Sequence, residues 1–130
     1  CDATGEFVFN LVTQTLLTSM SQSSAAIPLD ESEFEFCGLE SAPSYRVVPP
    51  RVAQSPAALE CRVVEIRQLQ GLNGVPCQSW FTIGEVIGIY LDPAFITEAG
   101  RFDTAKAAIP TRCGYQDYME AGDLFELTRP

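Results

Sequence analysis

The side chains that most often carry chemistry are scarce in this sequence. Its 130 residues include no histidine, so neither a Ser-His-Asp nor a Cys-His site can be assembled from them. The cysteines are odd in number, widely spaced and without a Cys-x-x-Cys pair: Cys1, Cys37, Cys61, Cys77 and Cys113. This spacing argues against both a zinc site and a disulfide framework. We expect reduced thiols, in particular at Cys37, Cys61 and Cys113.

Two glutamates, Glu60 and Glu85, lie in the most strongly patterned part of the chain. A carboxylate can act as a general acid or base where its surroundings perturb its pKa. We interpret both as structural groups, each facing the other's strand. The side chains therefore provide no catalytic constellation of their own.

Charge and composition exclude several classes of partner. The chain has 8 Lys and Arg against 17 Asp and Glu, a net charge of −9, which repels nucleic acid and anionic lipid. The sequence has no apolar run of the roughly 20 residues that a membrane crossing needs, and no signal-peptide profile at its start. We expect a cytoplasmic protein with no nucleic-acid or membrane partner, built as a single domain over residues 1–130.

The stretch that must organise the fold runs from Pro56 to Asp92 and predicts a long β-hairpin. Its first strand begins with alternating apolar and charged residues and becomes apolar on both faces at Val64 and Ile66, so we expect it to start half-solvated and end covered. The segment Gln70–Gln78 contains glycine, asparagine and proline and predicts an exposed loop.

The second strand of this hairpin is apolar at both parities, which is typical of a central strand buried on both faces. Gly84 and Gly88 have the same parity as Trp80 and Tyr90, so we expect them on one face. Glycine there permits either sharp curvature or the close approach of a flat ligand.

The remaining patterns predict short elements and an extended segment, and the whole predicts a mainly β fold with short helices. In chain order these are a strand at Phe7–Val12, a helix at Gln14–Gln22 capped by Thr13, a helix at about 31–37 ended by Gly38, a proline-rich extended arm at Ala42–Pro56, a helical turn at Thr104–Ala108 and a last strand at Leu124–Leu127.

Three blocks of sequence resemble the flavin reductase-like, FMN-binding split-barrel family. They are Gly5–Thr13, then Gly38-Leu39 with Val48–Pro56 and Leu59-Glu60-Cys61, and finally Ile83–Val86 with the closing Arg112–Pro130. The resemblance implies a Greek-key-like split β-barrel. It covers almost all of this chain but only the back portion of a family domain, so we expect a domain that is incomplete at its N-terminus.

The resemblance implies FMN as the cofactor and four residues at its site. Asn10 is expected near the isoalloxazine, while Arg112, Gly114 and Tyr118 are expected to border the flavin or the nicotinamide. Each has a structural alternative: Asn10 could satisfy a backbone group, Arg112 could pair with a surface carboxylate, and Tyr118 could be a core residue.

Two positions depart from the family pattern. Tyr115 follows Gly114 where relatives commonly have a second glycine, and Tyr90 stands where many relatives have histidine. Both changes bear on how a nicotinamide would reach the site rather than on the fold.

The resemblance implies NAD(P)H-dependent reduction of flavin by hydride transfer. The alternatives are a non-catalytic FMN-binding electron-transfer protein and a truncated scaffold that cannot hold flavin. Because the family's phosphate-binding block has no counterpart here, we expect FMN to bind at least about tenfold more weakly than in an extended protein. Family members also place flavin at a two-fold interface, so we expect a homodimer, with the apolar Val47, Val48 and Val52 of the proline-rich arm covered.

Overall fold

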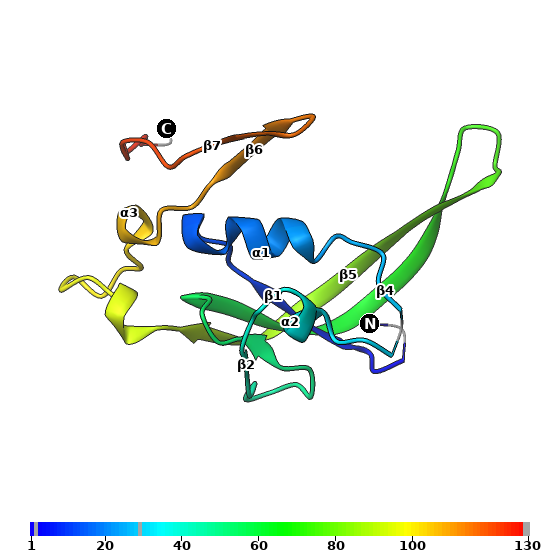
Figure 1. The fold of residues 1–130 in the computed structure, drawn as a ribbon, viewed down its shortest axis with the longest axis horizontal. Helices are drawn as coiled ribbons and strands as arrows, with labels where there is room; N and C mark the ends of the chain where they lie inside the picture. Colours follow the sequence, from blue (N-terminus) through cyan, green and yellow to red (C-terminus); the bar gives the residue numbers. More distant parts are fainter. Residues whose placement is uncertain (2, 29, 129–130) are drawn as a thin grey trace.

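A three-stranded antiparallel sheet forms the centre of the protein, in the order β1–β4–β5. The computed structural model describes residues 1, 3–28 and 30–128. Strand β1 (Glu6–Asn10) pairs with β4 (Ala57–Gln70), which pairs in turn with β5 (Pro76–Leu91). The predicted first strand and the long hairpin are therefore confirmed, and Figure 1 shows the hairpin extending well beyond the rest of the chain.

The prediction that β5 is a central, doubly buried strand is wrong. Strand β4 has a neighbour on each side, whereas β5 pairs with β4 alone in the described part of the chain. Trp80, Phe81 and Ile89 of β5 are exposed. The run of apolar residues correctly indicated two apolar faces, but composition cannot tell whether a face is covered.

Burial along β4 also runs opposite to the prediction. Ala58, Glu60 and Cys61 at its start are buried, whereas Val64 further on is 66% exposed. The reason is that β1 reaches only as far as the Glu6–Arg62 pair. Beyond it, β4 and β5 continue as a two-stranded ribbon, residues 64–83, which we call the arm (Figure 1). The predicted exposed loop lies at its tip.

The two glycines of β5 do not share a face as predicted. A side-chain carbon on Gly84 would lie 2.5 Å from the Phe7 ring, whereas one on Gly88 would lie 2.9 Å from the Arg46 stem. The pairing of β4 with β5 shifts by one residue between Glu60 and Cys61. Such a bulge moves the following side chains of the strand to the opposite face of the sheet from the one that strict alternation predicts. Both glycines make room for the protein's own side chains.

The helices are short, and all but the 3-10 turn at Pro93–Phe95 lie where the sequence predicted them. They are a 3-10 turn (Gln14–Leu16) running into α1 (Leu17–Gln22), α2 (Glu33–Phe36), a 3-10 turn at Pro93–Phe95, and α3 (Thr104–Ala107). Gly38 follows α2 with a φ of +64°, as expected of a helix end. Thr13 does not cap the first helix through its side chain; its hydroxyl instead lies 2.9 Å from that of Thr15.

Two small hairpins complete the mainly β fold, which confirms the predicted fold class. They are β2 (Ser41–Ala42) with β3 (Arg51–Val52), and β6 (Thr111–Gly114) with β7 (Asp117–Met119). The strand predicted at Leu124–Leu127 is wrong, because that segment is irregular and exposed. Alternating apolar and polar residues favour a strand, but a stable strand also needs a neighbouring strand to pair with. The closing block's residues 129 and 130 lie outside the described residues.

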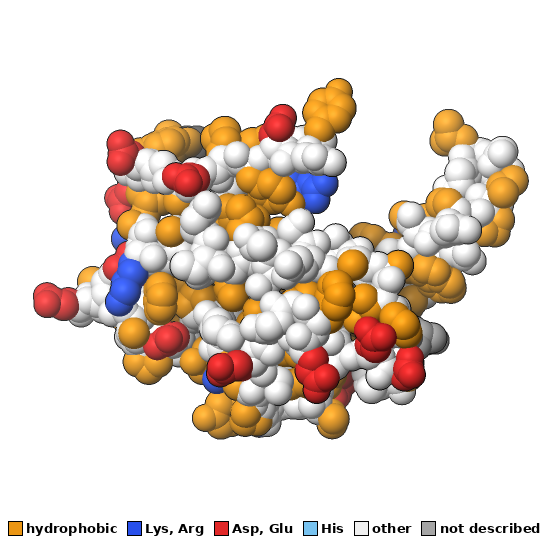
Figure 2. Space-filling model, viewed as in Figure 1, with side chains coloured by type: hydrophobic (Ala, Val, Ile, Leu, Met, Phe, Trp, Pro, Cys, Tyr) orange, Lys and Arg blue, Asp and Glu red, His pale blue; other side chains and the backbone are white. Residues whose placement is uncertain are grey.

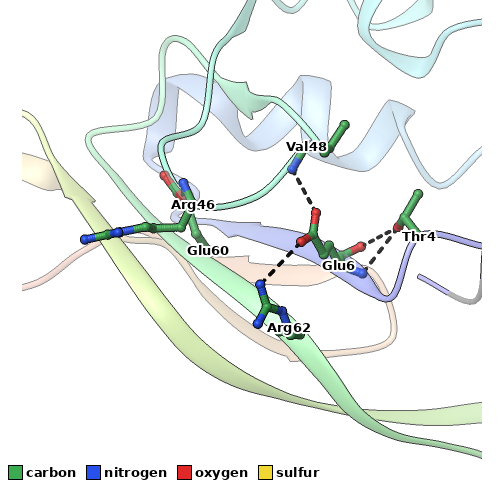
Figure 3. A network of polar contacts seen from close by, with 6 residues as sticks. All are labelled: Thr4, Glu6, Arg46, Val48, Glu60 and Arg62. Carbon is green, nitrogen blue, oxygen red and sulfur yellow. Dashed lines mark hydrogen bonds and ion pairs between the residues drawn. The ribbon is translucent and has the colours of Figure 1, made fainter.

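Two carboxylates of the sheet hold the proline-rich segment in place (Figure 3). Glu60 is 1% exposed, and its oxygens accept hydrogen bonds from the backbone amides of Tyr45, at 3.0 and 3.1 Å, and Arg46. Glu6 accepts one from the amide of Val48 at 2.9 Å. Because prolines remove donors and limit ladder pairing in this segment, side-chain acceptors replace a sheet partner.

All five cysteines are free in the structure, and the reduced state of Cys37, Cys61 and Cys113 stays a prediction. Cys37 and Cys61 are buried, and Cys113 is exposed. Burial raises the pKa of the Cys61 thiol above its usual value, because a low-dielectric surrounding disfavours the thiolate. Cys61 is therefore a packing residue rather than a nucleophile.

Candidate functional site

A cleft lies between β1, helix α1 and the segment from Leu39 to Val52. Its inner part has a volume of about 240 Å³ and an adjoining part a volume of about 480 Å³, and the two share several residues of their walls. The shared residues are Val8, Asn10, Ser23, Leu39 and Val52. The larger part falls within the range of small-molecule sites.

Asn10 is both a wall of this cleft and a structural tie. Its side-chain oxygen accepts a hydrogen bond from the backbone amide of Val52 at 2.9 Å, and its side-chain nitrogen donates to the carbonyl of Val8 at 3.4 Å. The amide group therefore fixes β3 against β1. Asn10 thus satisfies a backbone group, which is the structural role given above as its alternative. It also lines the cavity.

The lining of the cleft suits a flat, mainly apolar ring better than a phosphate. Leu16, Met20 and Phe34 contribute apolar surface, and the charged residues of the lining are Glu6 and Glu33. The described lining residues include no Lys or Arg. Phosphate sites need cations or clustered backbone donors, so an isoalloxazine fits this lining and the phosphate of a flavin nucleotide does not.

The other three expected site residues lie together on the β6–β7 hairpin. Arg112 donates to the Tyr118 hydroxyl at 3.3 Å and to the carbonyl of Tyr115 at 3.2 Å. Its guanidinium also lies 5.7 Å from the centre of the Tyr118 ring. Arg112 makes no ion pair with a carboxylate within the described chain, and Tyr118 is only half-buried. A cation that has no carboxylate partner and lies beside an aromatic ring is well suited to an anionic ligand.

Gly114 ends β6, and Tyr115 and Gln116 form the turn of this hairpin. Tyr115 has a φ of 51°, a left-handed conformation that glycine adopts more easily, and its side chain is almost fully exposed. A side-chain carbon on Gly114 would meet nothing within 4 Å. The backbone at residue 115 therefore adopts the left-handed conformation that glycine favours, although tyrosine stands where relatives commonly have the second glycine.

The structure does not bring Asn10 together with the hairpin residues. Asn10 ends β1 in the sheet, and in the view of Figure 1 helix α1 lies between β1 and the β6–β7 hairpin. The sequence reasoning also missed Arg51, whose guanidinium lies 3.6 Å from the centre of the Tyr90 ring. The Pro-Pro-Arg run was its only signal, because nothing in the spacing pairs Arg51 with a residue so far along the chain.

The family of the chain is shown by comparison with known proteins. Residues 2–105 match the family model described as a flavin reductase like domain. An uncharacterized protein of Halalkalibacterium halodurans is 32% identical over 126 residues, which cover 97% of this chain and 59% of that protein. The chain therefore belongs to the flavin reductase-like family.

Solved structures confirm the split-barrel fold. Nitrilotriacetate monooxygenase component B from Bacillus cereus superposes with a TM-score of 0.84 at 24% identity, covering 97% of this chain and 61% of that one. A putative flavin reductase with a split barrel domain from Shewanella frigidimarina gives 0.79 at 26% identity, covering 97% and 61%. The chain thus spans about three-fifths of the length of these relatives.

The described residues hold neither a metal-binding cluster nor a membrane-spanning helix. No group of three or more potential metal-ligating side chains comes together among them. None of their helices has the length and apolar character that a membrane crossing requires.

Proposed function

We propose that this protein binds FMN and belongs to the NAD(P)H-dependent flavin reductases, acting as a homodimer in the cytoplasm. The observation that carries the proposal is the family match over residues 2–105, together with an apolar cleft lined by Asn10. A bound flavin supplies hydride chemistry itself, so the protein has to bind and orient rather than act as acid or base. This agrees with a sequence that has no histidine.

Within this proposal, the residues have separate tasks. The cleft beside β1 receives the isoalloxazine, with Asn10 in its wall. Arg112 and Tyr118 provide a cation and an aromatic ring on the hairpin, and Gly114 leaves open space beside them. We assign these three to the side of the site where the flavin or the nicotinamide nucleotide binds.

The decisive measurement is the absorbance spectrum of the purified chain with added FMN, followed by addition of NADH or NADPH. A flavin spectrum that bleaches as the nicotinamide is oxidised supports the reductase. A flavin spectrum that neither nucleotide bleaches supports a non-catalytic FMN-binding electron-transfer protein. A chain that is colourless once unbound FMN has been removed by gel filtration would leave only a scaffold unable to hold flavin.

Arg112→Ala tests the site residue most directly. Removing a charge-assisted contact to a ligand typically costs about 1.5 to 3 kcal/mol, so FMN or NAD(P)H affinity should fall about tenfold or more. Arg101→Ala is the matched control, since Arg101 is an exposed arginine whose 3.3 Å pair is with Glu126. Equal effects of the two substitutions would remove Arg112 from the site.

A further inference from the structure

Two arginines lie over neighbouring positions on one face of β5, outside the cleft. The guanidinium of Arg51 is 3.6 Å from the centre of the Tyr90 ring. The stem of Arg46 lies over Gly88, where an added side-chain carbon would be 2.9 Å from it. The pairing with β4 does not shift between Gly88 and Tyr90, so these two positions face the same side of the sheet, about 7 Å apart along the strand. The described lining of the cleft includes neither arginine.

Most of the hydrogen-bonding capacity of Arg51 is unused. A guanidinium has several N–H donors in a fork that matches the oxygens of a phosphate. Among the described contacts, the Arg51 side chain makes one hydrogen bond, at 3.5 Å to the carbonyl of Val52, and its buried Nε has no acceptor. A buried donor without an acceptor is unfavourable. A bound anion therefore explains this side chain better than packing on Tyr90 alone.

Arg46 adds a second cation to the same patch. The ion pairs of the described residues include neither Arg46 nor Arg51. Glu60 lies below Gly88, but it is 1% exposed and its oxygens accept backbone amide hydrogens. Figure 3 shows the side chain of Arg46 extending away from this carboxylate. Two guanidinium groups are therefore available to an anionic ligand, although the chain has a net charge of −9.

The arrangement of the two cations suits a diphosphate group. Arginine binds phosphate oxygens through two parallel hydrogen bonds, and two arginines anchored about 7 Å apart can each take one phosphate of a pair. A single carboxylate would engage only one of them. The class of ligand is therefore a diphosphate, either free or within a dinucleotide.

The position of the patch favours the dinucleotide. Tyr90 lies opposite Ala58, and Ala58 lies opposite Asn10 in the wall of the cleft. The two outer residues of this row are two strand spacings apart, about 10 Å. A dinucleotide that is held by its diphosphate at the arginines is long enough for one of its bases to reach the cleft.

We propose that Arg46 and Arg51 bind the diphosphate of a nicotinamide dinucleotide, with the Tyr90 ring holding Arg51 in position. The diphosphate site follows from the patch itself, whereas the choice of nicotinamide rests on the proposed function. Phosphates bound at the arginines leave the apolar cleft to the rings.

The test is calorimetric titration of the purified full chain with NAD⁺, NADP⁺ and inorganic pyrophosphate. The oxidised dinucleotides donate no hydride, so binding is measured apart from turnover. Nicotinamide riboside, which has no phosphate, is the control ligand. Arg46→Gln and Arg51→Gln should each weaken binding of both dinucleotides at least about tenfold and leave binding of the riboside unchanged. Arg67→Gln removes the same charge from an exposed arginine of the arm and should change nothing.

Substitutions of Tyr90 test whether its ring positions Arg51. Tyr90→Phe keeps a ring beside the guanidinium and should bind the dinucleotides like the wild type, whereas Tyr90→Leu should weaken them as Arg51→Gln does. Far-ultraviolet circular dichroism checks that the variants are folded. Arg46 is exposed, so its variant tests the site without disturbing the contact between Arg51 and Tyr90.

The outcomes distinguish this site from the proposed function. Arginine variants that bind all three ligands like Arg67→Gln, or a wild type that binds none of them, would overturn the site. Pyrophosphate that binds as tightly as the dinucleotides, through the same arginines, would overturn the dinucleotide as the ligand. Arginine-dependent binding of the dinucleotides without reduction of FMN by NADH or NADPH would overturn the reductase and support the site.

Discussion

Glu60 shows how one buried carboxylate can organise a segment that has little regular structure. Its two oxygens accept the amide hydrogens of Tyr45 and Arg46, and Gly88 leaves room for it from the opposite strand. The sequence predicted structural roles for Glu60 and Glu85, each facing the other's strand. The structure places Gly88 opposite Glu60 and Arg62 opposite Glu85.

Glu60→Gln should destabilise the fold by about 1–3 kcal/mol, because one acceptor is replaced by a donor that faces buried backbone donors. Unfolding in urea, followed by far-ultraviolet circular dichroism, measures the change. Glu85→Gln is the control: Glu85 is exposed and has no hydrogen bond or ion pair among the described contacts, so its effect should stay within about 0.5 kcal/mol. Similar midpoints for the two variants would contradict the assigned role.

Strand β5 needs a glycine at residue 84, where the side chain of Phe7 from β1 lies close to its backbone. An added side-chain carbon at Gly84 would lie 2.5 and 2.6 Å from two atoms of the Phe7 ring and 3.0 Å from the side chain of Cys61. We expect Gly84→Ala to cost about 1–3 kcal/mol, the usual range for overpacking. Gly122→Ala, where a side-chain carbon would meet nothing within 4 Å, serves as control in the same urea titration. A neutral Gly84→Ala would show that the ring moves aside freely.

At the scale of elements, local patterns were reliable and long-range placement was not. The hairpin, β1 and the short helices follow from alternation, turn residues and helix signals that lie within a few neighbours of each residue. The bulge between Glu60 and Cys61 could not be predicted, because a period of two continues unchanged through it in the sequence. Gly84 and Gly88 were assigned to one face for that reason.

At the scale of the whole molecule, this chain spans 61% of the solved Shewanella frigidimarina relative, and the described lining of its cleft has no Lys or Arg. We therefore expect FMN to bind this chain at least about tenfold more weakly than an N-terminally extended form of the protein, a difference of about 1.4 kcal/mol or more. Titration of flavin fluorescence against both proteins measures it. Riboflavin, which lacks the phosphate, is the control ligand and should reduce the difference. Equal FMN affinities would show that the described residues suffice.

The candidate site was predictable only in its separate parts. Asn10, Arg112, Gly114 and Tyr118 came from a family resemblance, and the last three do lie on one hairpin. That Asn10 bonds to Val52 could not be foreseen, since 42 residues separate them. The stacking of Arg51 on Tyr90 was missed for the same reason. Contacts between distant segments depend on the complete fold rather than on spacing.

Strand β4 pairs with both β1 and β5, and the chain segments that connect it to these two strands differ greatly in length. The link from β4 to β5 is residues 71–75, whereas the link from β1 to β4 is residues 11–56. Loop-closure entropy grows with the logarithm of length, so joining β1 to the sheet costs about 2 kcal/mol more than closing the hairpin. The hairpin is thus the entropically favoured first pairing, and the cleft, whose wall is β1, exists only once the costlier closure is complete.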